Sequence, residues 1–118
     1  MKNYLTPEQD SEFDGYIKKW QGILGLNDWR IERSQKRAAK ENLAQVQIFL
    51  RDRLASYRTG QWGDVKPREL EATALHELLH VMLADLKNAV DKDADDTTLD
   101  SVEHAVVIRL EKLLLKDS

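Results

Sequence analysis

The chain contains no cysteine, and this absence excludes three classes of site at once. Disulfide scaffolds, thiolate zinc centres and cysteine nucleophiles all need the missing side chain. Long apolar runs are also missing. No stretch approaches the roughly 20 apolar residues of a membrane span, and the first ten residues hold no apolar core of signal-peptide length. We therefore expect a cytoplasmic protein that does not act on a membrane.

Length and composition are those of an ordinary globular chain. The 118 residues are 42% hydrophobic and 33% charged, which predicts one domain over residues 1–118 with a single modest core. The net charge of −3 is unevenly spread, because basic residues outnumber acidic ones between Arg30 and Arg68. A nucleic-acid surface would interleave such residues with exposed aromatics, and only Tyr57 and Trp62 offer them here. We interpret this stretch as solvated surface and do not expect nucleic acid as a partner.

The N-terminal part of the chain predicts a helix followed by three strands. Thr6 is a candidate N-cap with Pro7 in the first helical position, apolar residues then recur every three or four positions, and Gly25 is a candidate left-handed stop. Period-two alternation follows in three short stretches, at 29–32, 45–50 and 54–59. We predict that these strands form a small antiparallel meander, with Arg51-Asp52-Arg53 as the turn between the last two.

The C-terminal part predicts two helices, from Pro67 to Leu86 and from Ser101 to Leu115, joined by a polar linker from Lys87 to Leu99. The order of elements predicts an α+β fold with one small sheet. Asp91, Asp93 and Asp95 invite comparison with a calcium loop. However, that loop needs glycine in its sixth position and glutamate in its twelfth, and the chain has Asp96 and Val102 there. We therefore predict a solvated linker.

His76-Glu77-Leu78-Leu79-His80 matches the pattern H-E-x-x-H, and the spacing has a physical reason. Residues four apart on a helix lie one turn apart on the same face, so two imidazoles can bind one ion. Glu77 lies beside the first histidine, where its carboxylate can accept a proton from a water that the metal activates. The alternative is a pair of ordinary core or rim histidines with a solvated glutamate. Three histidines in the whole chain, two of them here on an apolar helix, favour a zinc site.

A catalytic zinc needs three protein ligands, and the candidates for the third are Glu103 and His104, followed by the carboxylates between Asp85 and Asp100. A helix advances about 100° per residue, so Glu103 falls within the apolar stripe of the last predicted helix and His104 at its margin. We therefore predict Glu103 as the ligand and His104 as a supporting or alternative ligand. A competing hypothesis makes Asp100-Ser101-Val102-Glu103 a capping box, in which Glu103 only satisfies backbone donors.

These residues resemble a family. The segments that carry the resemblance are 29–32, 44–46, 71–80 with the H-E-x-x-H motif, and Glu103-His104-Ala105-Val106-Val107. They are similar to the small metallopeptidases encoded by phages and prophages, which are minimal zincins with a layout like that of SprT-like and compact gluzincin domains. The resemblance implies a zinc site of His76, His80 and a residue of the last helix, with Glu77 as general base. It also implies an edge strand near residues 45–50 that holds an extended peptide.

Three functions of different classes remain, and the least favoured is a nucleic-acid-associated protein that uses the Arg30 to Arg68 surface on a zincin scaffold. The first is a zinc metallopeptidase that cleaves a protein or peptide, located in the host cytoplasm if a phage encodes it. The second is a non-catalytic, metal-containing binding or regulatory module. Larger relatives steady the oxyanion with a separate side chain, for which Tyr57, His104 and Arg109 are the candidates here. The sequence leaves the substrate, the scissile bond and the oligomeric state open.

Overall fold

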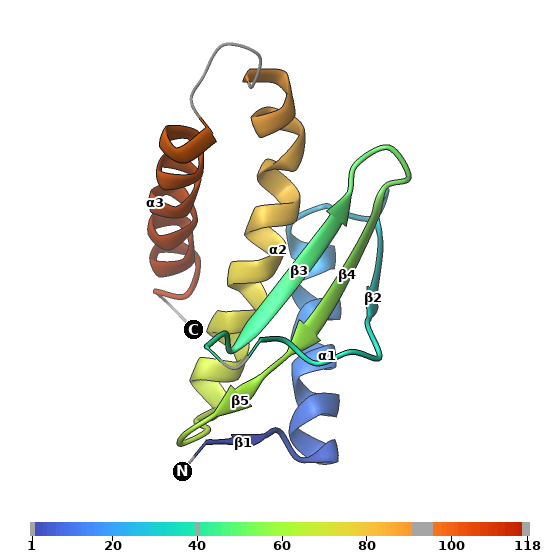
Figure 1. Ribbon diagram of the computed structural model, residues 1–118, viewed down its shortest axis with the longest axis vertical. Coiled ribbons are helices and arrows are strands. Elements are labelled where there is room, and N and C mark those ends of the chain that lie inside the picture. Colours follow the sequence, from blue (N-terminus) through green and yellow to red (C-terminus); the bar gives the residue numbers. More distant parts are fainter. Residues whose placement is uncertain (1, 40, 91–95, 117–118) are drawn as a thin grey trace.

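The computed structural model describes residues 2–39, 41–90 and 96–116, and it has the α+β architecture that the sequence predicts (Figure 1). Three helices and two small sheets make up this part of the chain. Their order is β1 (Asn3–Tyr4), α1 (Pro7–Ile23), β2 (Arg30–Arg33), β3 (Ala44–Phe49), β4 (Leu54–Thr59), β5 (Gln61–Trp62), α2 (Pro67–Val90) and α3 (Asp96–Leu114).

Both predicted ends of α1 are confirmed. Thr6 and Gln9 form a capping box, in which each side chain accepts a hydrogen bond from the other residue's backbone N–H. Pro7 occupies the first turn, where its missing N–H removes no helical bond. Gly25 follows the helix with a φ of 71°, the left-handed conformation that ends many helices. The helix buries the apolar stripe of Phe13, Ile17 and Trp20.

The larger sheet differs from the predicted antiparallel meander, which is wrong in its first pairing. The strand order is β2-β4-β3, with β3 antiparallel to β4 and β2 parallel to it. The chain passes from one edge of the sheet to the other between β2 and β3. Residues 34–38 run beside β4, where Ser34 N–H donates to Tyr57 O and Ala38 N–H donates to Thr59 O. β4 takes the central place because Ala55, Tyr57 and Thr59 are its buried face. Local alternation identifies strands but does not give their order.

The turn at 51–53 is where the sequence predicts it, and Arg53 adopts a positive φ of 50° there. The sequence predicts no strand in the segment after β4. This segment forms β5, which pairs antiparallel with β1 and buries Trp62, whose indole N–H donates to Leu43 O at 3.1 Å. A two-residue strand is too short to leave a periodic signal in the sequence.

Both C-terminal helices are longer than predicted. α2 continues past Leu86 to Val90, and α3 begins at Asp96, so much of the predicted linker is helical. The remaining part of that linker, with the aspartates compared to a calcium loop, lies outside the described residues. The capping-box hypothesis is wrong, because Glu103 lies well inside α3 rather than in its first turn.

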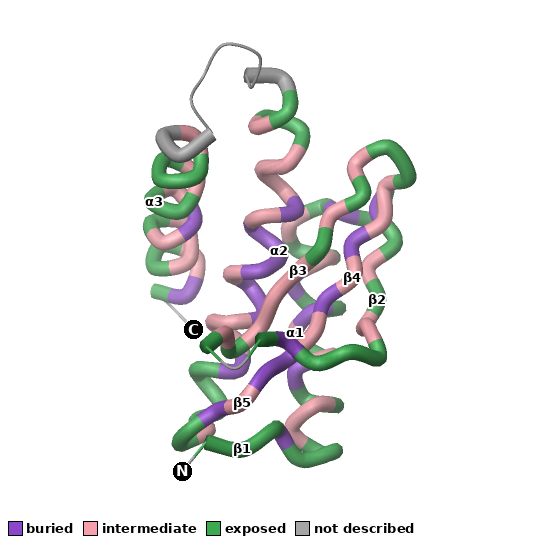
Figure 2. The backbone as a smooth tube through the Cα atoms, in the orientation of Figure 1, coloured by how far each residue is buried: buried purple, intermediate pink, exposed green. Residues whose placement is uncertain are grey.

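The core lies where α1, α2 and the inner face of the sheet meet, and α3 packs against the other side of α2 (Figures 1 and 2). α2 supplies the largest share of it, including Leu70, Leu75, Leu78 and Leu79, while α3 adds Val107. The part of the α2 surface that does not face the core therefore lies between β3 and α3. None of the helices described here is long and apolar enough to cross a membrane.

Candidate metal centre

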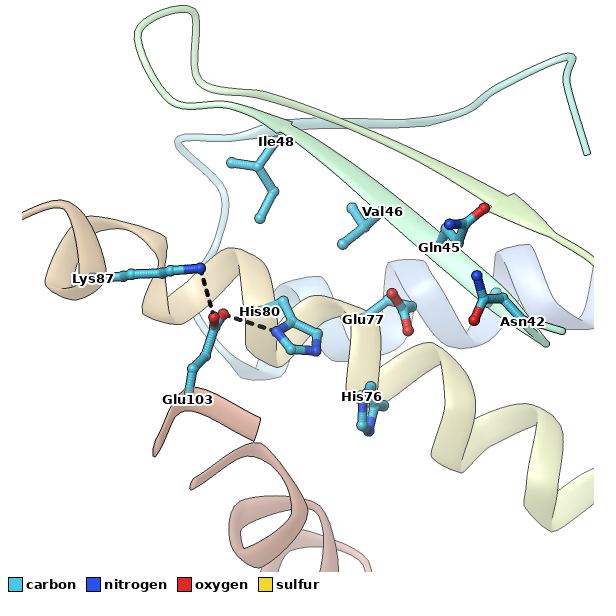
Figure 3. Close-up of a pocket in the computed structure, with 10 residues that line it drawn as sticks. Asn42, Gln45, Val46, Ile48, His76, Glu77, His80, Lys87 and Glu103 are labelled. Carbon is cyan, nitrogen blue, oxygen red and sulfur yellow. Dashed lines mark hydrogen bonds and ion pairs between the residues drawn. The ribbon is translucent and has the colours of Figure 1, made fainter. Parts of the chain in front are cut away.

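Packing of α2 decides where the H-E-x-x-H motif points. Leu75, Leu78 and Leu79 are almost completely buried against the core. His76 and His80 lie beside these positions, on the adjoining face of the helix, and face the space between β3 and α3 (Figure 3). Their ring centroids are 5.1 Å apart, as expected for residues one helical turn apart.

α3 brings the third histidine of the chain to the same place. The ring centroid of His104 lies 5.6 Å from that of His76. One ligand atom from each of the three imidazoles lies within 4.8 Å of the other two, close enough to hold a metal ion. His76 and His80 are half-buried and His104 is exposed, so an ion here would be reached from solvent. In the part of the chain that the structure describes, no other trio of histidine, aspartate or glutamate side chains converges in this way.

Each α2 histidine has a carboxylate of α3 at hydrogen-bond distance from its Nδ1 nitrogen. Nδ1 of His76 lies 2.9 Å from Oε2 of Glu111, and Nδ1 of His80 lies 2.8 Å from Oε2 of Glu103. An ionised carboxylate only accepts hydrogen bonds, so this arrangement places the proton on Nδ1 and leaves Nε2 free to bind a metal. Sequence reasoning missed Glu111. A search of the last helix for one carboxylate per candidate metal-binding histidine would have found it.

Glu103 faces α2, as the helical spacing predicts. However, it contacts Nδ1 of His80 and so supports this histidine, whereas the trio that could hold a metal includes His104 instead. The other oxygen of Glu103, Oε1, lies 3.0 Å from the ammonium of Lys87, which also lies 2.7 Å from Oδ1 of Asp100. Burial acts to raise the pKa of Glu103, but hydrogen bonds from His80 and Lys87 outweigh it and leave this pKa below its usual value. Glu103 is therefore an ionised acceptor.

Glu77 is in the opposite situation. It is 8% exposed, and among the described residues nothing donates a hydrogen bond or an ion pair to its carboxylate. Burial, and then the negative charge of Glu111, raise the pKa of Glu77 to about 8 in the metal-free protein. None of the described side-chain oxygens is both fully enclosed and unpaired, so the carboxylate of Glu77 reaches the solvent of a cleft. A carboxylate with a raised pKa in a cleft is a candidate functional group.

A cleft of about 420 Å³ runs between β3 and α2, with Glu77 on its floor (Figure 3). Ala44, Val46 and Ile48 line the strand side, and His76 and His80 line the helix side. β3 is an edge strand, as the resemblance implies, because no described strand pairs with its outer side.

The register shows which backbone groups of β3 are free. Gly60 N–H donates to Leu43 O at 2.8 Å, so Leu43 and the alternate residues Gln45 and Gln47 bond to β4. The N–H and C=O groups of Val46 and Ile48 consequently point outward, along the cleft.

Two of the three residues considered for steadying an oxyanion lie elsewhere. The hydroxyl of Tyr57 donates to Asp14 at 2.7 Å, between β4 and α1. Arg109 is exposed on α3, and neither residue lines the cleft. Of the candidates, only His104 lies at the histidine cluster.

No protein-family model matches this chain, and neither curated proteins nor solved structures include one that matches it. The resemblance to small phage metallopeptidases therefore rests on the sequence segments named above, and the function has to be argued from the site itself.

Proposed function

We propose that the protein is a zinc-dependent hydrolase that cleaves a peptide or an extended protein segment. The observation that carries this proposal is the convergence of three imidazoles beside Glu77, a nearly buried carboxylate to which no described residue donates a hydrogen bond. His76, His80 and His104 are the proposed ligands, Glu77 is the proposed general base, and Glu103 and Glu111 hold the two α2 histidines.

The donor set fits zinc better than a hard cation. Three neutral imidazole nitrogens form a common catalytic zinc environment, whereas calcium and magnesium need oxygen ligands. Hydrogen bonds from metal-binding histidines to carboxylates are the usual outer shell of such sites. We prefer His104 to Glu103 as third ligand, because one ligand atom of His104 lies within 4.8 Å of both other histidines while both oxygens of Glu103 already have partners.

In the proposed reaction, zinc and the side chain of Glu77 have different roles. When bound, zinc supplies Lewis acidity, which polarises a carbonyl and makes water a better nucleophile near neutral pH. Glu77 accepts the proton of the attacking water and passes it to the leaving amine. Burial raises the pKa of Glu77 in the metal-free protein, and a dication bound beside it would lower that pKa and favour the ionised form that accepts a proton.

The free edge of β3 is the proposed binding site for the substrate backbone. The outward N–H and C=O groups of Val46 and Ile48 can pair with an extended peptide, as an added strand does. The scissile bond would then lie above Glu77, which shares the cleft with both residues.

The deciding experiment compares the zinc-loaded protein with its Glu77→Gln variant on a library of unstructured peptides. We expect the wild type to cleave some of them. The variant should keep zinc and fold but lose at least about 100-fold in kcat, because an amide cannot accept the proton. Cleavage by Glu77→Gln at the wild-type rate would refute the general-base assignment. Stoichiometric zinc without any cleavage would instead support the non-catalytic metal-containing module.

A further inference from the structure

Lys87 is a charged residue at the cleft that neither the motif nor the proposed reaction uses. It lies on α2 seven positions after His80, about two turns further along the same face. Both side chains can therefore reach one residue of α3, and they do. The ammonium of Lys87 and Nδ1 of His80 contact opposite oxygens of Glu103, at 3.0 Å and 2.8 Å (Figure 3).

The two histidines of α2 are held unequally. Glu103 is sandwiched between His80 and a cation, and its side chain is only 13% exposed, so solvent screens this contact little. Glu111 holds His76 without such help, since none of the described lysines or arginines forms an ion pair with it. A glutamate side chain has three rotatable bonds. A second fixed contact reduces the number of rotamers it adopts and so holds its carboxylate more firmly against the imidazole.

We propose that Lys87 is a positioning residue of the metal centre, which acts through Glu103 to keep His80 in the Nδ1–H tautomer with Nε2 free for zinc. This inference rests on the proposed metal site. Lys87 is not assigned to the substrate, because its ammonium is already shared between Glu103 and Asp100. Its contribution is to hold the Glu103 carboxylate in the orientation that accepts from Nδ1.

Lys87 could also have a purely structural role, which the experiment has to distinguish from positioning Glu103. Lys87 also bonds to Asp100, and this exposed pair could do no more than fasten α2 to α3. Asp100→Asn is the matched control, because it removes that ion pair and leaves Lys87, Glu103 and His80 in place. Lys87→Met removes both contacts while keeping a side chain of similar length. Lys87→Arg restores a cation.

The first measurement is zinc affinity, by competition with a chromophoric chelator, for the full chain and these variants. We expect Lys87→Met to weaken zinc binding about tenfold or more, Asp100→Asn to stay within about twofold of wild type, and Lys87→Arg to recover most of the loss. In a Glu103→Gln background, Lys87→Met should lower the zinc affinity little further, because the carboxylate through which Lys87 acts is already missing.

The second measurement is the tautomer of His80 in the metal-free protein, read from the ¹⁵N shifts of its imidazole at neutral pH. Wild type and Asp100→Asn should show the Nδ1–H form, and Lys87→Met a mixture of both. Equal losses of affinity in Lys87→Met and Asp100→Asn, or an unchanged tautomer in Lys87→Met, would overturn the proposal. If the wild type binds no zinc, the proposed function fails by itself, while the tautomer measurement still decides the role of Lys87.

Discussion

At the scale of single residues, Glu77 and Glu103 show how neighbours determine what a carboxylate can do. Both are largely withdrawn from solvent and both lie at the cleft. No described residue donates a hydrogen bond to Glu77, and burial raises its pKa to about 8. At Glu103 the hydrogen bonds from His80 and Lys87 outweigh burial and lower the pKa. The first is suited to accept a proton and the second to hold an imidazole, which is how one functional group takes two roles in one site.

The raised pKa of Glu77 predicts how the stability of the metal-free protein depends on pH. Its folded-state pKa of about 8 exceeds the ordinary value of 4.5, so the folded state keeps a proton that the unfolded state loses. The contribution of Glu77 to the free energy of unfolding should therefore be highest below about pH 4.5. It should fall as the pH rises towards 8, by at most about 1.4 kcal/mol per pH unit. Urea unfolding across this range should show this component in the wild type.

The control for this titration is Glu77→Gln, which has no carboxyl group to ionise. Its metal-free form should lack the decline between pH 4.5 and 8. Parallel curves for the two proteins would show that Glu77 titrates normally.

A second prediction at this scale concerns the ligand set. His104→Ala should weaken zinc binding by more than about 100-fold, because it removes a donor atom of the ion. Glu103→Gln should weaken it about 10- to 100-fold, the usual effect of losing a supporting carboxylate. Isothermal titration with zinc measures both. The opposite order of losses would make Glu103 the third ligand and His104 the supporting residue.

At the scale of elements, the site depends on α3 and β3 lying on either side of α2. α3 delivers Glu103, His104 and Glu111 together, and its buried Val107 docks it on the core. β3 delivers an unpaired strand edge that faces the same cleft. Neither element carries the complete chemistry, so the correct packing of three elements is a condition for function.

The role of the β3 edge is tested by proline substitution at two neighbouring positions. The N–H of Val46 points outward, so Val46→Pro removes a donor for a bound peptide without breaking the β3–β4 ladder. We expect it to raise KM for extended peptides about tenfold or more while zinc affinity stays unchanged. Val46→Ala, which keeps the N–H, shows how much of this effect comes from the lost side chain.

Gln47→Pro is the contrasting variant, because the N–H of Gln47 bonds to β4. Its main effect should be a lower melting temperature. Full peptide affinity in Val46→Pro would exclude strand addition at this edge.

At the scale of the whole molecule, the three histidines lie on two helices that pack as neighbours around one core. A metal ion that binds all three ties α2 to α3 and binds only the folded state. Mass action then stabilises the folded protein by about 2.7 kcal/mol at a free zinc concentration 100 times the Kd.

We therefore predict about one zinc per chain in protein purified without a histidine tag, and a melting temperature that falls when a chelator removes it. For a domain of this size, such a loss corresponds to a fall of roughly 10 °C. The His76→Ala, His80→Ala double variant should bind no zinc and show no response to the chelator. Absence of zinc from the wild type, with the same melting temperature in chelator, would rule out the metal site.

The sequence by itself determined the elements and the central motif, because these depend on local physics. The capping box at Thr6, the left-handed Gly25, the turn before β4 and the helix around His76 to His80 are each specified by residues a few positions apart. The same local spacing directed Glu103 towards α2. It failed where signals were short or ambiguous, at β5 and at the ends of α2 and α3.

Only the tertiary structure decided how distant segments meet. The parallel pairing of β2 with β4 and the contacts of Glu103, His104 and Glu111 with the α2 histidines join residues far apart in the chain. The angular position of a residue on its own helix does not give the offset and rotation of the neighbouring helix. Those are set by how Val107 and the leucines of α2 pack, and a shift of one position would change which side chains of α3 face the histidines.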